Sequence, residues 1–392
     1  MERVESVLDN AVGSGIVPGA VALVRHRGAV VLHRAFGEAQ SSDTTRPMNL
    51  DTRFDLASLT KPLVGAGVAL ALVDRGAVSL DEEITRFLPE LRSVHGRGVT
   101  LRRLLSHSAG VRGWRPLYVW ARTRDDILEA VDGLGLASDP GSRFEYSDIG
   151  FIVLGIALER IGGSRLDDLA QELLFTELGL ERTSYTPTGS AEDFAVTERG
   201  NAFERRMAEW AGLDFAGWRT EFHPGEVNDG NSHYGLGGVS AHAGLFSDAR
   251  DLGVLGEMWR NGGSWEGRRV LSPAVVTAAT SDQGPGGSRR GLGWELMKSG
   301  APSVAELSRA DAGFFPPTSS PFTPRSSGEL VSAGAFGHTG FTGTSMWIDP
   351  ERELVMVLLT NATHPAVDLD KPLNALRARF HNAAVASVTS AA

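Results

Sequence analysis

The chain has 392 residues, 42% of them hydrophobic, which is enough to bury a large core in one big domain or two closely packed ones. Its formal net charge of -10 leaves no basic stripe for a phosphate backbone, so we expect no nucleic-acid partner. The absence of cysteine excludes disulfides, thiolate zinc sites and a cysteine nucleophile.

The first residues, Met1 to Ser6, are acidic and amphipathic, with no basic stretch leading into an apolar one. We therefore expect a cytoplasmic protein. The longest apolar stretch, Leu63 to Val73, is interrupted by glycine and shorter than the roughly 18 residues that a membrane span needs. It predicts a core helix, with no membrane partner. No cofactor is expected, and the oligomeric state stays open.

In the first half of the chain, the pattern predicts a β-hairpin between helices. The hairpin follows from two Val-rich runs around a turn at residues 26–28. The long helix near residue 58 has Pro62 in its first turn, where a missing N–H costs little. The predicted elements are a helix over 2–13, strands over 19–24 and 29–34, a helix over 58–74, a Thr-capped segment over 99–106, and helices over 150–160 and 166–178.

The second half begins with a long irregular stretch, residues 179–235, which is rich in Gly, Pro and aromatic residues. Loops of this length are usually functional or disordered, and the aromatic residues favour a lid or a pocket wall. Further along, the pattern predicts a helix over 248–261, a strand over 292–297 between Gly/Ser/Pro-rich loops at 284–288 and 316–327, strands over 343–348 and 354–359, and a helix over 368–384.

This order of elements predicts an α+β fold, because strands and helices are segregated along the chain rather than alternating. We expect an antiparallel sheet flanked by the N- and C-terminal helices, with a large, mostly helical insertion. Residues 1–60 and 235–392 would form the sheet domain and residues 61–234 the helical domain. The active site would lie at their junction.

The pair Ser58 and Lys61 is the first candidate for chemistry, because residues three apart share a helix face. Lysine occurs at only three positions against 35 arginines, so a lysine here indicates a need for its amine. Apolar residues surround Lys61, which predicts burial and a lowered pKa, and therefore a usable base. The simpler interpretation is a Ser cap with a lysine reaching out to solvent.

With this motif in place, the chain resembles the serine hydrolases of the penicillin-recognising, class C β-lactamase-like family. The resemblance extends from about Gly15 to Thr363. It rests on three motifs in the family's order and on two accessory stretches. These are Ser58-Leu59-Thr60-Lys61, Tyr146-Ser147-Asp148 and His338-Thr339-Gly340, with Leu104-Leu105-Ser106-His107-Ser108-Ala109-Gly110 and Ala243-Gly244-Leu245-Phe246-Ser247.

The resemblance implies a role for each matching residue. Ser58 would be the acylated nucleophile, Lys61 its activator and Tyr146 the phenol that relays the proton. The backbone N–H groups of Ser58 and Phe341 would form the oxyanion hole. The substrate-binding positions would be Asp148, His338, Thr339 and Gly340.

Two departures from the family pattern bear on the substrate. Asp148 stands where the family has Asn, and His338 replaces a Lys and removes a permanent positive charge. We therefore expect weak β-lactam hydrolysis and a substrate without the carboxylate of β-lactams and peptidoglycan stems. A small-molecule ester or amide, handled by an esterase or transacylase, fits better.

Other functions require residue patterns that can be looked for in the sequence. The alternatives within the fold are a DD-peptidase or β-lactamase, and a non-catalytic penicillin-binding-type sensor or scaffold. No lysine follows a glycine as a P-loop requires, and Ser106 to Gly110 lacks the first glycine of a nucleophile elbow. A zinc site could be drawn from residues without metal-ligand spacing, and no metal is expected. These residues are His223, His233, His242 and Asp229.

Overall fold

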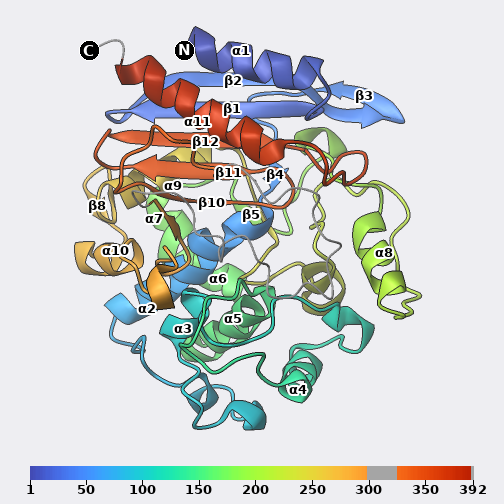
Figure 1. Cartoon of the computed structure of the whole chain (residues 1–392), viewed down its shortest axis with the longest axis vertical. Coiled ribbons are helices and arrows are strands. Elements are labelled where there is room, and N and C mark those ends of the chain that lie inside the picture. Colours follow the sequence, from blue (N-terminus) through green and yellow to red (C-terminus); the bar gives the residue numbers. More distant parts are fainter. Residues whose placement is uncertain (298–324, 390–392) are drawn as a thin grey trace.

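The computed structural model describes residues 1–297 and 325–389, and its largest feature is a seven-stranded antiparallel sheet (Figure 1). The strand order is β3-β2-β1-β12-β11-β10-β9, so the first and last strands of the chain meet in the middle of the sheet. The strands are β1 (Gly19–His26), β2 (Ala29–Ser42), β3 (Thr44–Pro47), β9 (Glu295–Leu296), β10 (Phe336–Thr339), β11 (Ser345–Asp349) and β12 (Leu354–Thr360).

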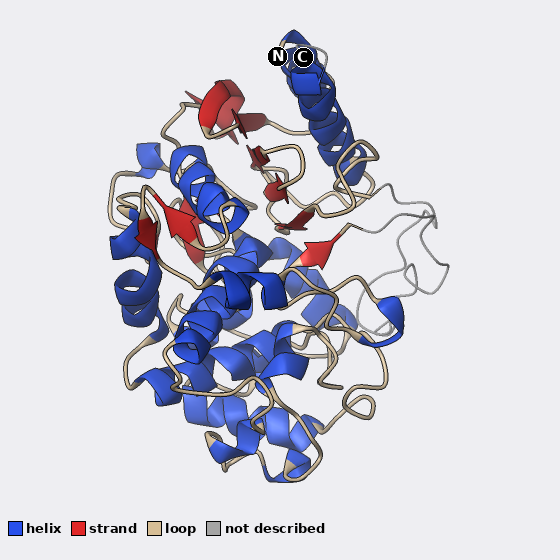
Figure 2. Ribbon diagram, turned by 90° about the vertical axis from the view of Figure 1, so that its left-hand side faces the viewer, coloured by secondary structure: helices blue, strands red, loops and turns tan. Residues whose placement is uncertain are grey.

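Helices cover both faces of this sheet, as the burial of its central strands shows. Every residue of β12 is buried, which a strand covered on both faces requires. Alternate residues serve different cores: Met356 packs with the terminal helices and Val357 with the rest of the molecule. The helices α1 (Glu2–Gly13) and α11 (Leu373–Thr389) lie side by side on one face, and α9 (Ala249–Arg260) packs against the other (Figures 1 and 2). The predicted α+β fold with flanking terminal helices is confirmed.

The helical part of the chain lies on the α9 side of the sheet (Figure 1). Two small sheets accompany the main one, in the orders β4-β6-β5 and β7-β8. The helices are α2 (Gly67–Asp74), α3 (Leu101–Leu105), α4 (Arg124–Leu134), α5 (Asp148–Gly162), α6 (Leu166–Ala170), α7 (Thr176–Leu178), α8 (Ala202–Trp210) and α10 (Pro273–Ala279). The short strands are β4 (Phe54–Asp55), β5 (Ser184–Tyr185), β6 (Leu245–Ser247), β7 (Ser264–Trp265) and β8 (Arg268–Arg269).

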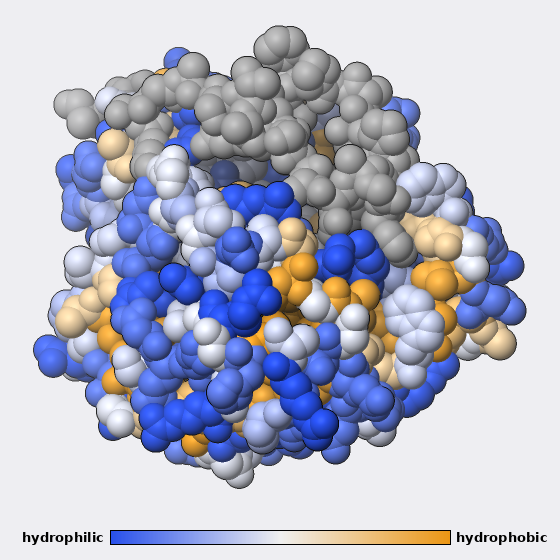
Figure 3. Space-filling view, turned by 60° about the horizontal axis from the view of Figure 1, so that its bottom comes forward, coloured by the Kyte–Doolittle hydropathy of each residue, from blue (hydrophilic) through white to orange (hydrophobic). Residues whose placement is uncertain are grey.

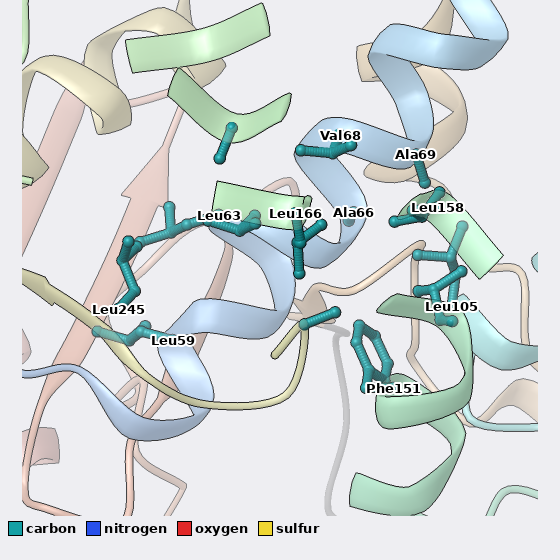
Figure 4. Packing of buried hydrophobic residues seen from close by; sticks show 14 of the residues in the cluster. Leu59, Leu63, Ala66, Val68, Ala69, Leu105, Phe151, Leu158, Leu166 and Leu245 are labelled. Atoms are coloured by element: carbon teal, nitrogen blue, oxygen red, sulfur yellow. The ribbon is translucent and has the colours of Figure 1, made fainter. Parts of the chain in front are cut away.

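One continuous helix, Ala57–Asp74, passes from the sheet into the helical part. Among the described residues it is the one helix long and apolar enough to be compared with a membrane span, and 83% of it is buried within the fold. Its side chains pack against Phe151 of α5 and Leu166 of α6 (Figure 4). A Cβ atom at Gly65 would lie 3.0 Å from the Phe151 ring, so the close approach of the two helices requires glycine. The segment is a core helix.

Several boundaries differ from prediction. The terminal helix begins at Leu373 rather than 368, directly after Pro372. The stretch 179–235 contains α8, which Gly and Pro on both sides concealed, and β5, which pairs with β6 across the predicted domain boundary. The strand predicted over 292–297 is only β9, and most of the predicted loop 316–327 lies outside the described residues. The domain boundaries stay a prediction.

Candidate active site

Ser58 sits on a tight 3₁₀ turn, Ala57–Leu59, directly after β4. The residue before it, Ala57, has a φ of 47°, a conformation that costs energy for a residue with a side chain. Asp55 holds this turn: its Oδ1 accepts from the Ala57 N–H at 2.8 Å and its Oδ2 from the Asn228 N–H at 2.7 Å. Burial raises the pKa of Asp55 to about 6. We did not predict this role for Asp55, because its partner is remote in sequence.

Lys61 is fully buried, and its ammonium group meets three acceptors. Nζ lies 2.8 Å from Ser58 Oγ, 3.0 Å from the His242 carbonyl oxygen and 2.6 Å from Asp148 Oδ1. Burial acts to lower the pKa of Lys61, but the Asp148 carboxylate and the Tyr146 phenol outweigh it and the pKa is raised. The prediction of a lysine with a lowered pKa was therefore wrong, because the sequence did not reveal the carboxylate beside it.

Asp148 is the first residue of α5 and directly follows the N-cap residue Ser147. The Ser147 Oγ accepts from the Gly150 N–H at 2.8 Å, and the Asp148 N–H donates to the Gly113 carbonyl. This places the Asp148 carboxylate on Lys61 while leaving its side chain 20% exposed. Asp148 thus contacts the lysine directly, and its predicted contact with substrate stays a prediction.

Tyr146 lies among three nitrogen-bearing side chains. Its ring centroid is 5.0 Å from Lys61 Nζ, 4.5 Å from the stacked ring of His107 and 6.1 Å from the ring of His338. His107 Nδ1 accepts from the Ser147 N–H at 3.0 Å, while its Nε2 is buried without a partner among the described residues. The structure therefore brings the first, second and third motifs together, as predicted.

The third motif begins on β10 and continues into a turn that is tied to the nucleophile's own strand. Thr342 Oγ1 donates to the Asp55 carbonyl at 2.7 Å, and Thr344 Oγ1 to the Leu56 carbonyl at 3.0 Å. A Cβ at Gly340 would lie 2.3 Å from the Leu56 oxygen, so this approach needs glycine. The turn holds Phe341 next to the strand that leads into Ser58.

The oxyanion hole predicted from the N–H groups of Ser58 and Phe341 stays a prediction with favourable geometry. In the described part of the chain, neither N–H donates to a protein acceptor. The Phe341 side chain is 43% exposed and its ring lies 5.4 Å from that of Phe203 in α8. The stretch 179–235 therefore contributes an aromatic wall beside the turn.

Figure 3 shows one face of the molecule, with apolar side chains gathered near its centre among hydrophilic ones.

His338 is buried and neutral. Its Nδ1 donates to the Thr339 carbonyl at 2.8 Å, which leaves Nε2 as an acceptor with no partner among the described residues. Burial, with the charges of Arg290 and Lys61, holds the pKa of His338 well below its usual range. His338 thus supplies no positive charge where the family pattern has a lysine.

His242, one of the residues from which a zinc site could be drawn, is engaged in hydrogen bonds within the protein. His242 Nε2 is hydrogen-bonded to Asp229 Oδ1 at 2.8 Å and its Nδ1 to Ser240 Oγ at 2.7 Å, while its carbonyl holds Lys61. No group of three or more metal-ligating side chains is found within residues 1–297 and 325–389. The hydrogen bond between Asp229 and His242 holds in place the residue whose carbonyl accepts from Lys61 Nζ. Only the folded chain reveals this role.

Comparison with known proteins gives one family and several similar folds. The family model described as β-lactamase matches residues 4–379. An N-acetylmuramyl-L-alanine amidase of Bacillus subtilis (strain 168) is 29% identical over 398 residues, covering 95% of this chain and 84% of that protein.

Two solved structures share the fold. EstCE1, a hydrolase with promiscuous acyltransferase activity, matches with a TM-score of 0.70 and 24% identity over 98% of both chains. A penicillin-binding protein homologue from Caulobacter crescentus matches with a TM-score of 0.71 and 21% identity, over 98% of this chain and 97% of the other. At these identities the two structures support only the assignment of the fold.

Proposed function

We propose that this chain, which belongs to the β-lactamase family, is a serine esterase, amidase or transacylase acting on a small-molecule ester or amide. The observation that carries the proposal is the contact of 2.8 Å between Lys61 Nζ and Ser58 Oγ, with Tyr146 beside the same ammonium group. A serine hydroxyl held by a buried cation and next to a phenol can form an acyl-enzyme. The family membership supports a hydrolase, and the finer assignment is ours.

The three acceptors around Lys61 support Tyr146 as the group that takes the proton. An ammonium that donates to Ser58, His242 and Asp148 has no lone pair to offer. We therefore assign the base to Tyr146, whose ring centroid lies 5.0 Å from Lys61 Nζ. Ser58 Oγ attacks the substrate carbonyl as its proton passes to Tyr146. The phenol then protonates the leaving alcohol or amine.

Deacylation reverses the direction of the proton. Water, or an alcohol or amine, attacks the acyl-enzyme as its proton passes to Tyr146, and Ser58 recovers a proton from the phenol when its ester bond breaks. The N–H groups of Ser58 and Phe341 would stabilise the oxyanion in both steps. Hydrolysis and acyl transfer differ only in the second nucleophile, which is water in the first case and an alcohol or amine in the second.

Incubation with a p-nitrophenyl acyl ester tests the proposal. We expect release of p-nitrophenol and, by mass spectrometry of a quenched digest, an acyl group on the peptide carrying Ser58. The Ser58→Ala variant should show neither. Absence of both signals from the unaltered protein would sink the enzyme proposal and leave the sensor or scaffold alternative.

Product analysis separates hydrolysis from transfer. With an added amine or alcohol, a transacylase yields the corresponding amide or ester alongside the free acid. If only free acid forms at every concentration of the added nucleophile, the transacylase assignment is wrong and the esterase assignment stands.

A further inference from the structure

Arg290 places a positive charge beside Tyr146 from a part of the chain outside the three motifs. It lies just before β9, and its backbone carbonyl accepts from the Gln283 N–H at 2.7 Å. Its guanidinium carbon is 5.0 Å from the centroid of the Phe144 ring and 5.9 Å from that of Tyr146. Arg290 therefore rests against the second motif.

Not every N–H group of the Arg290 guanidinium has a hydrogen-bond acceptor among the described residues. Nη1 is buried and has no hydrogen-bond partner among the described residues. Nη2 lies 3.9 Å from Glu295 Oε2, which is too far for a hydrogen bond. A buried donor without a partner is costly, and a ligand that supplies an acceptor recovers that cost. The side chain keeps 16% exposure, so its surroundings are not closed off.

The other charges around Tyr146 are already committed. Lys61 donates to three protein acceptors, and the pKa of His338 is held below its usual range by burial and by Arg290 itself. The same two causes lower the pKa of His107. Arg290 is thus the cation beside Tyr146 whose hydrogen-bonding capacity remains open in the described part of the site.

We propose that Arg290 binds a carboxylate of the substrate through its unpaired edge, while Ser58 attacks the ester or amide bond of the same molecule. A planar carboxylate matches the guanidinium fork. It also matches the charge, because Glu295 offsets part of one positive charge and Lys61, the other cation beside Tyr146 in the described part of the site, already donates to three protein acceptors. The proposal rests on the proposed function and names its substrate class.

This inference revises the expectation drawn from His338. The missing third-motif lysine predicts a substrate without a carboxylate, but the fold brings a cation to the neighbourhood of Tyr146 from another segment. Both residues lie near that ring: His338 is on β10, and Arg290 is in the segment before β9, where it forms an isolated bridge with Glu295. The expected weakness toward β-lactams then rests on Asp148, whose carboxylate is engaged with Lys61.

A matched pair of substrates tests the proposal. The p-nitrophenyl monoester of adipic acid and p-nitrophenyl hexanoate have the same chain length and differ by one carboxylate. We expect the unaltered protein to show a kcat/KM at least about 10-fold higher for the adipate ester, and Arg290→Gln to lower that ratio by roughly 10- to 100-fold. Arg290→Lys keeps the charge without the fork and should retain part of the preference.

Arg143→Gln is the matched control, because it also removes one positive charge, at a position three residues before Tyr146 in the sequence. Its guanidinium already pairs with Glu145 at 2.7 Å, so the adipate-to-hexanoate ratio should not change. Equal ratios in the Arg290→Gln and Arg143→Gln variants, or no preference in the unaltered protein, would overturn the proposal.

The two proposals fail in different ways. Hexanoate turnover without an adipate preference refutes the role of Arg290 and leaves the acyl-enzyme intact. If neither ester is turned over, binding of adipic acid monoanilide and of hexananilide to the Ser58→Ala variant, measured by calorimetry, makes the same comparison without chemistry. Equal affinity for both anilides would refute the carboxylate site.

Discussion

Two sets of side chains around Tyr146 differ in their hydrogen bonding. The first is Lys61, whose ammonium has an acceptor for every N–H. The second is His107, His338 and Arg290, each with a buried nitrogen that has no partner among the described residues. We call these two sets the paired side and the unpaired side.

The difference separates chemistry from recognition. A fully hydrogen-bonded cation is held in one position, which a proton-transfer site needs before the substrate arrives. Buried polar atoms without partners are costly and uncommon, and a ligand that pairs with them gains binding energy. We therefore expect changes on the paired side to lower kcat and changes on the unpaired side to raise KM.

The largest expected effect is on the paired side. Lys61→Met keeps the side chain's length but removes the charge that holds Ser58 and lies beside Tyr146, and we expect kcat to fall roughly 100-fold or more. Lys371→Met is the control, since that lysine lies just before α11, far from the motifs in sequence. Turnover of p-nitrophenyl esters measures both. Near-normal kcat in Lys61→Met would remove the lysine from the mechanism.

Asp148→Asn should weaken the interaction between position 148 and Lys61 while leaving the Lys61 side chain in place. Burial lowers the pKa of Lys61 and Asp148 raises it, so the neutral amide leaves the lowering effect less opposed and Lys61 loses its proton at lower pH. We expect activity at neutral pH to fall about 10-fold, and the alkaline limb of the kcat/KM profile to move to lower pH.

The exposed Asp139→Asn is the control for that profile, because its side chain is 85% exposed and pairs with Arg97. Its pH–rate curve should overlay that of the unaltered protein. An alkaline limb that stays in place in Asp148→Asn would show that Asp148 does not hold the proton on Lys61.

On the unpaired side, His338→Leu removes the acceptor Nε2 from a buried position. We expect KM to rise about 10-fold and kcat to stay within about threefold, since no group in the described part of the chain is hydrogen-bonded to that nitrogen. The exposed His95→Leu should change neither constant. A collapse of kcat with unchanged KM would place His338 in the chemistry and break the distinction between the two sides.

The smallest expected effect concerns the free energy of unfolding and comes from Glu198, which belongs to neither set of side chains around Tyr146. Burial raises the pKa of Glu198 to about 7, so the folded protein holds a proton that the unfolded chain releases above about pH 4.5. The stability from this protonated carboxyl is complete below pH 4.5 and is lost as pH rises through 7. The glutamine in Glu198→Gln cannot lose a proton, and Asn228 Oδ1, which has no partner among the described residues, can accept from the new amide.

We therefore expect Glu198→Gln to match the unaltered protein at pH 5 and to exceed it by about 1–3 kcal/mol in free energy of unfolding at pH 8.5. Urea denaturation at the two pH values measures this, and ester turnover should not change. Glu209→Gln, an exposed residue of α8, is the control and should show no pH-dependent difference. Equal stability differences at both pH values would contradict the pKa shift.

Much of the fold is predictable because its signals are local. The β-hairpin, the helix predicted over 58–74 and the Thr100 cap follow from patterns within a few residues, and the structure confirms them. The start of α11 and the presence of α8 were missed, because Pro and Gly signals there competed with a short apolar repeat. Local patterns locate elements better than their ends.

The sequence by itself determined that Ser58 and Lys61 are neighbours, because they are one helical turn apart and need no other segment to meet. Only the tertiary structure decided what surrounds them. Asp148 lies 87 positions beyond Lys61 and reverses the expected direction of its pKa shift, and Arg290 reaches Tyr146 from the sheet edge. A pKa and an unpaired donor depend on neighbours in space, and those neighbours are remote along the chain.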